Sequence, residues 1–169
     1  GPRLSPDLPL VFLGARGAIN FNLSVDLRDG AHHSGNWGGV LADPAIILAH
    51  AISTITDKNG KIQIPEWHPT SLSQNVRELI ATLPLPTGPK IDAYWGDETL
   101  TPQERIYDWN AFAVLAMESG VPAAPVNAIA GKAHAICQLR FVVGTNEADI
   151  LPALRRHLDR LGLQHVRIK

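Results

Sequence analysis

The most constraining feature of the sequence is a strict alternation of apolar and polar side chains over residues 18–28. The apolar positions are Ile19, Phe21, Leu23, Val25 and Leu27. Because successive side chains of a strand point to opposite faces, the pattern predicts a long strand with one buried and one polar face. We expect Asp29-Gly30 to end it. A chain with such a strand needs a sheet that is covered on one side only.

A second alternation, over residues 132–143, predicts another long strand. Cys137 falls on its apolar side, whereas Arg140 falls on the polar side beside Gln138 and His134. The polar faces of the two long strands are therefore expected to form the uncovered side of one sheet.

The remaining pattern predicts helices over residues 43–56 and 145–162, and strands over 61–65, 109–118 and 164–168. Asp43-Pro44 marks the first helix start, as an N-cap followed by proline. The main elements follow the order β-α-β-β-α-β, which is the ferredoxin-like plan: an α+β fold with a four-stranded antiparallel sheet and two helices on one face. We expect residues 67–108 to be a partly helical insertion, with helices over 71–83 and after Thr101-Pro102.

Composition limits the classes of partner. Lys and Arg number 15 and Asp and Glu 16, so we expect neither nucleic acid nor a membrane as a partner. No apolar run approaches the roughly 20 residues that span a bilayer, and no signal peptide is recognised in this chain, so a cytoplasmic location is expected. The 169 residues, 45% of them hydrophobic, predict one domain, and the charged fraction of only 18% predicts that part of its surface is covered.

Few residues are candidates for chemistry. The single cysteine, Cys137, excludes an internal disulfide, and its apolar strand face favours a buried, inert thiol. His32 and His33 are adjacent in an extended segment and point to opposite sides, so no metal site is expected within this chain. The Arg140 guanidinium suits a carboxylate, but the pattern equally permits a solvent-exposed or ion-paired arginine. For Asn127 the local pattern favours a turn residue.

Several motifs, taken together, resemble one family. They are Gly14-x-Arg16-Gly17, His33-Ser34-Gly35-x-Trp37-Gly38-Gly39, the helix start at Asp43-Pro44, and residues 60–65. Their order is similar to that in the lid, or dimerization, domain of a zinc-dependent metallopeptidase family. This family includes carnosinases, aminoacylases and succinyl-diaminopimelate desuccinylase. The resemblance covers nearly the whole chain and is strongest to the carnosinase-like dipeptidase branch.

The resemblance implies that residues 1–169 are a single lid domain, excised from a larger two-domain metallohydrolase. Two zinc ions and the general base would belong to the missing catalytic domain, so this chain alone should be inactive and hold no cofactor. The implied partners are a second copy of the lid, its own catalytic domain, and a dipeptide or N-acyl amino acid whose amide bond is cleaved. The resemblance also implies that His33 stabilises the oxyanion in the partner's active site, while Asn127 and Arg140 hold the carboxylate end of the substrate.

Two other classes of function stay open. The first is a self-contained ferredoxin-like module that binds a small ligand or a protein without catalysis, which gives His33 and Arg140 no special role. The second is a small enzyme that uses His32, His33 or Cys137 directly. It requires a contact between a base and a nucleophile, which the sequence does not indicate.

Overall fold

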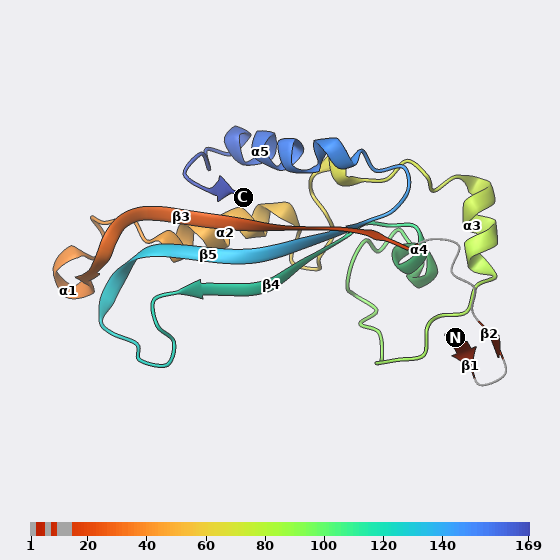
Figure 1. Ribbon diagram of the computed structural model, residues 1–169, viewed down its shortest axis with the longest axis horizontal. Helices are drawn as coiled ribbons and strands as arrows, with labels where there is room; N and C mark the ends of the chain where they lie inside the picture. The colour runs from red at the N-terminus through yellow and green to blue at the C-terminus, as the bar shows by residue number, and fades with distance from the viewer. Residues whose placement is uncertain (1–2, 6–7, 10–14) are drawn as a thin grey trace.

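The computed structural model describes residues 3–5, 8–9 and 15–169. Its centre is a four-stranded sheet in the order β4-β5-β3-β6, in which every pair is antiparallel (Figure 1). The strands are β3 (Gly17–His33), β4 (Ala111–Ser119), β5 (Ala128–Phe141) and β6 (Arg167–Ile168). A two-stranded ribbon, β1 (Arg3–Ser5) and β2 (Leu8–Pro9), precedes the sheet in the chain.

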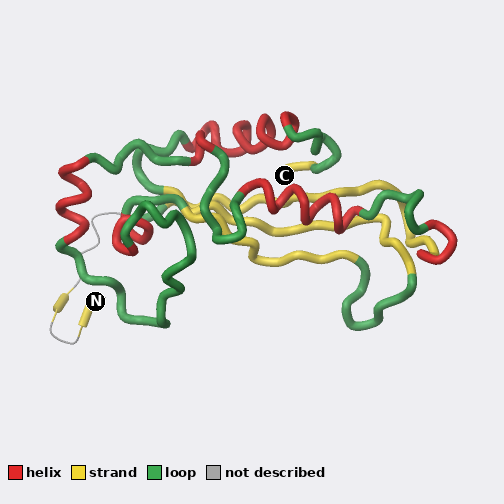
Figure 2. Tube along the Cα trace, turned by 180° about the vertical axis from the view of Figure 1, so that it is seen from behind, coloured by secondary structure: helices red, strands yellow, loops and turns green. Residues whose placement is uncertain are grey.

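Helices α2 (Pro44–Ile55) and α5 (Ile150–Arg160) cover the same face of the sheet (Figure 2). The apolar positions of β3 and β5 pack with both helices in one core. Its fully buried members include Leu23, Val25, Leu48, Ile55, Leu139, Leu154 and Leu158. Polar residues of the same strands line the opposite face. This arrangement confirms the α+β prediction and is consistent with the ferredoxin-like plan.

Local sequence explains where the first covering helix begins. Asp43 Oδ1 accepts hydrogen bonds from the backbone N–H groups of Ala45 at 2.8 Å and Ile46 at 3.3 Å. These bonds satisfy two donors that the first turn of a helix leaves free, and Pro44 follows as the first helical residue. The predicted start of this helix is therefore confirmed.

The first strand does not end at Asp29-Gly30, so this part of the prediction is wrong. β3 continues to His33 through a bulge. Asp26 pairs with Lys132 and Ala31 with Ala130, so β3 advances five residues while β5 advances two. Turn residues on one strand are accommodated because pairing resumes beyond them. Residues 31–33 thus belong to the sheet, and a one-turn helix α1 (Ser34–Trp37) follows directly.

Other expected boundaries also differ. Residues 61–65 form a single bridge, Thr56 to Ile62, because no neighbouring strand continues the pairing. The helix expected over 71–83 is α3 (Gln74–Ala81), which Ser73 caps. The helix expected over 145–162 starts as a 3-10 turn (Glu147–Asp149) before α5, and the last strand is only the two residues of β6.

The segment between the first helix and β4 is tied to the frame at several points. The Trp67 indole is fully buried and donates to the Ile150 carbonyl at 2.9 Å. Arg77 of α3 and Glu104 of α4 (Pro102–Tyr107) form an ion pair at 2.5 Å. Arg16, just before β3, donates to the Arg105 carbonyl at 2.6 Å at the end of α4. In the part of the chain described, no helix has the length and apolar character to cross a membrane.

Candidate functional site

The turn that follows β3 holds the His33 imidazole in one orientation. His33 is the last residue of β3 and the N-cap of α1, and its Nδ1 accepts a hydrogen bond from the Gly35 backbone N–H at 3.1 Å. Because Nδ1 is the acceptor, the proton of the neutral ring lies on Nε2. The side chain is exposed, so the turn presents an Nε2–H donor at the end of the sheet.

Steric contacts explain why two positions of this turn are glycine. A Cβ at Gly35 would lie 2.8 Å from His33 Cε1, and a Cβ at Gly38 would lie 2.6 Å from the Ser34 carbonyl oxygen. Ser34 itself donates twice to the Asn127 carbonyl, from its backbone N at 2.9 Å and its Oγ at 3.1 Å. The His-Ser-Gly-x-x-Gly spacing therefore builds a turn that carries His33 and holds it next to Asn127.

Arg140 lies at the other end of the same sheet. His33 pairs with Ala128 at the start of β5, while Arg140 pairs with Ala18 at its far end. The twelve steps from Ala128 to Arg140 span roughly 40 Å at about 3.3 Å per residue. The structure thus brings His33 and Asn127 together, but it does not bring Arg140 to them within one copy of the chain.

Hydrogen bonds along the polar face orient Arg140. Its Nε donates to Gln138 Oε1 at 3.0 Å, and Gln138 Nε2 donates in turn to Asn20 Oδ1 at 2.8 Å. Within residues 15–169 no carboxylate lies within 4.0 Å of this guanidinium, so the ion-paired alternative is not observed. A guanidinium held through Nε keeps its terminal N–H fork for a planar carboxylate.

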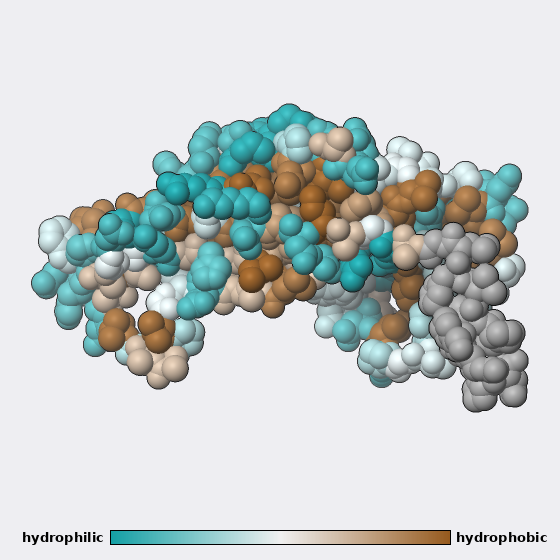
Figure 3. Space-filling view, viewed as in Figure 1, coloured by the Kyte–Doolittle hydropathy of each residue, from teal (hydrophilic) through white to brown (hydrophobic). Residues whose placement is uncertain are grey.

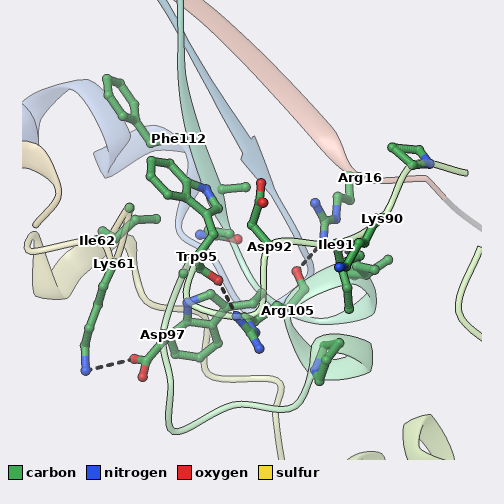
Figure 4. A pocket seen from close by; sticks show the side chains of 18 residues that line it. Arg16, Lys61, Ile62, Lys90, Ile91, Asp92, Trp95, Asp97, Arg105 and Phe112 are labelled. Atoms are coloured by element: carbon green, nitrogen blue, oxygen red, sulfur yellow. Dashed lines mark hydrogen bonds and ion pairs between the residues drawn. The ribbon is translucent and has the colours of Figure 1, made fainter. Parts of the chain in front are cut away.

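A cavity of about 420 Å³ opens beside this end of the sheet (Figure 4). It lies between the start of β4, helix α4 and the segment 89–97. Its aromatic and aliphatic lining includes Ile62, Ile91, Trp95, Trp109 and Phe112. These residues come from distant parts of the chain, so no sequence motif predicted the cavity.

Most charged side chains around the cavity form an ion pair or a hydrogen bond. Lys61 pairs with Asp97 at 3.1 Å, and Arg105 donates to the Trp95 carbonyl. Burial raises the pKa of Asp97, but hydrogen bonds from Thr99 and the Lys61 charge outweigh burial and lower it. Burial, together with the neighbouring positive charge of Arg140, lowers the pKa of Arg16, which lines the cavity. Arg16 lies two residues before Ala18, the register partner of Arg140.

The described residues offer neither a metal centre nor a nucleophile with its base. Across residues 15–169 and the short ribbon, no group of three His, Cys, Asp or Glu side chains could hold a metal ion. Cys137 is completely buried, and burial raises the pKa of its thiol to about 11. It pairs with Phe21 in mid-sheet, far from the His33 turn, so this thiol is not placed for catalysis.

Comparison with known proteins identifies the domain. The family model described as the peptidase dimerisation domain (M20_dimer) matches residues 13–166. The Beta-Ala-His dipeptidase of Rattus norvegicus is 36% identical over 62 residues, which are 37% of this chain and 13% of that protein. The Cys-Gly metallodipeptidase of Schizosaccharomyces pombe is 37% identical over 57 residues, 34% of this chain and 12% of that protein.

Two solved structures have the same fold. An M20 family metallo-carboxypeptidase from Sulfolobus solfataricus superposes with a TM-score of 0.80 at 23% identity, covering 100% of this chain and 40% of that one. Human carnosine dipeptidase 1 superposes with a TM-score of 0.72 at 19% identity, covering 91% of this chain and 36% of that one. The chain therefore spans well under half the length of these proteins. Because the family model matches nearly all of the described sheet and helices, the chain belongs to the peptidase dimerisation domain family of M20 metallopeptidases.

Proposed function

We propose that this domain is the dimerisation and active-site lid domain of a two-domain M20 metallopeptidase. The parent enzyme cleaves amide bonds of dipeptides or N-acyl amino acids. The named dipeptidases among its relatives support this substrate class. In this proposal a zinc-bearing catalytic domain supplies the hydrolytic chemistry, and this chain supplies hydrogen bonds and shape; membership of the M20 peptidase dimerisation domain family supports it.

The observation that carries the proposal is the orientation of His33. The Gly35 N–H occupies Nδ1, which leaves Nε2–H as a donor on an exposed turn. Such a donor, aimed at the oxyanion of a tetrahedral intermediate, contributes about 3 kcal/mol in a site that excludes water. Because the ring is held before substrate arrives, little reorganisation is needed when the negative charge develops.

The separation within one copy supports a site shared by two copies. A dipeptide cannot contact His33 and Arg140 of the same chain across roughly 40 Å. If two copies pair along β4 in antiparallel orientation, the ends of the two sheets are reversed. The His33 end of one sheet then lies on the same side as the Arg140 end of its partner. Neighbouring strands are about 4.8 Å apart, so four such steps separate β3, which carries His33, from β5 of the partner, which carries Arg140.

Strand β4 has the properties of a pairing edge. Among the strands that the structure describes, only β5 pairs with it, and three of its large apolar side chains are exposed: Val114 by 41%, Leu115 by 51% and Met117 by 47%. Beside it, Met117 and helix α2 enclose a groove of about 350 Å³. The one charged residue of β4, Glu118, is next to its last residue, so most of this edge is apolar and open to pairing with another strand. We infer that β4 and the neighbouring α2 surface form the dimer contact.

A complementation experiment tests this arrangement in the full-length protein. His33→Ala and Arg140→Ala dimers should each lose activity, His33→Ala by about two orders of magnitude in kcat with zinc content unchanged. Refolding an equal mixture should restore about a quarter of the wild-type activity, because half the dimers are mixed and each keeps one intact site. His32→Ala serves as the control and should retain activity. Mixtures no more active than their components would contradict the shared site.

A further inference from the structure

The cavity and Arg140 adjoin each other at the same end of the sheet. Ala111, which lines the cavity, is the register partner of Arg140, and Ala18 is its partner on the other side. Side chains of register partners lie on one face, with Cβ atoms about 5 Å apart. Arg16, two residues before Ala18, also lines the cavity. The cavity therefore begins one strand away from the guanidinium.

The interior of the cavity suits a flat apolar group. Trp95 lies against the Gly60 backbone, where a Cβ would come within 2.6 Å of the indole, and 54% of Trp95 remains exposed. Trp109 and Phe112 contribute further aromatic surface. Figure 4 shows Trp95 on the same side as Lys61 and Ile62, and Arg16 with Lys90 on the other. The volume of about 420 Å³ lies within the usual range for small-molecule sites, roughly 300–1,000 Å³.

We propose that this cavity receives the side chain of the substrate's carboxyl-terminal residue and selects for aromatic residues at that position. The inference rests on the proposed function, in which Arg140 holds the terminal carboxylate. An aromatic side chain extends about 7 Å from the carboxylate carbon, and neighbouring strands lie about 4.8 Å apart, so this length exceeds the one strand step from Arg140 to Ala111 at the edge of the cavity. The exposed Lys90 and Asp92 place opposite charges at the rim, so the apolar lining determines the preference.

The test compares Ala-Phe with Ala-Ala as substrates of the full-length enzyme. Burial of an aromatic side chain in an apolar cavity strengthens binding of the transition state, so kcat/KM should favour Ala-Phe by at least about tenfold. Trp95→Ala should lower kcat/KM for Ala-Phe about tenfold and leave Ala-Ala unchanged, while Trp95→Phe should keep most of the preference. Tyr94→Ala is the matched control, because Tyr94 is 68% exposed and does not line the cavity.

The outcomes separate this inference from the proposed function. Arg140→Ala should lower kcat/KM for both dipeptides. It should also remove the higher kcat/KM of Ala-Phe over the same dipeptide with a carboxyl-terminal amide. If that result is obtained but Trp95→Ala affects the two dipeptides equally, or neither, the side-chain subsite is overturned while the carboxylate role stands. If Arg140→Ala preserves the advantage of the free acid, the carboxylate role itself fails, and the subsite fails with it.

Discussion

At the scale of single residues, the site depends on glycines, which have no side chain, as much as on the hydrogen bonds of polar groups. The His33 imidazole occupies the space that a side chain at position 35 would need. Its contact with the Gly35 N–H determines which ring nitrogen carries the proton. The chemistry expected of His33 is thus set by a neighbour that has no side chain of its own.

Gly35→Ala should release this ring. An added methyl group 2.8 Å from Cε1 forces the imidazole away and breaks the Nδ1 hydrogen bond, while the exposed turn remains folded. Nitrogen-15 NMR of the neutral imidazole should show the Nε2–H tautomer in the wild type and a mixture of tautomers in Gly35→Ala. Asn36→Ala, in the same turn, should resemble the wild type. A mixture already present in the wild type would refute the preorganised donor.

At the scale of elements, the bulge in β3 carries the His33 turn beyond the core. Residues 27–30 pass over Gly131 of β5, and a Cβ there would lie 2.1 Å from the Arg28 carbonyl oxygen and 2.6 Å from that of Gly30. Both obstacles are backbone atoms, which cannot move aside as a side chain can. Gly131 therefore allows the long strand to bend and still resume pairing at Ala31.

Gly131→Ala should consequently destabilise the domain by about 2 kcal/mol or more, since overpacking against backbone forces the strands apart. Urea denaturation of the two proteins measures the difference. Gly88→Ala provides the control, because no atom lies within 4 Å of the added Cβ and the backbone there is ordinary. Equal midpoints for Gly131→Ala and Gly88→Ala would show that the bulge tolerates a side chain.

At the scale of the whole molecule, hydrophilic residues gather over the outer side of α5, and hydrophobic residues lie between that helix and the sheet (Figure 3). Helices α2 and α5 complete the core, the polar sheet face holds Arg140, and strand β4 remains an apolar edge. The His33 turn and Arg140 stand at opposite ends of the long strands. The proposed twofold pairing through β4 uses the apolar edge and leaves the polar face exposed.

Leu115→Lys should therefore convert the dimer to a monomer, because a charge in the middle of β4 must be desolvated when two edges pair. Light scattering over a dilution series should give twice the monomer mass for the wild type and the monomer mass for the variant. Val143→Lys places the same charge on a side chain that is 84% exposed beyond β5, and it should remain dimeric. Dimers in both variants would place the contact elsewhere.

Much of the fold could be predicted because period-two patterns survive in the folded chain. The alternation around Phe21 and Leu139 predicted which faces are buried, and Asp43-Pro44 marked a real helix start. The bulge at Asp29-Gly30 could not be predicted, since a turn signal does not tell whether pairing resumes beyond it. The sequence predicted a strand over residues 61–65, but only one bridge forms there, at Ile62. A local pattern contains no information about which segment will lie beside it.

The candidate site divides in the same way. Local patterns were enough to predict the β-α-β-β-α-β order and the polar face that carries Arg140, and they singled out the His33-Ser34-Gly35 motif, because each depends on residues close together in the chain. The folded structure was needed to show that Ser34 bonds to Asn127 beside His33, that Arg140 lies roughly 40 Å away, and that a cavity opens beside Arg140. These relations depend on strand register and on contacts between distant segments, which local side-chain patterns do not encode.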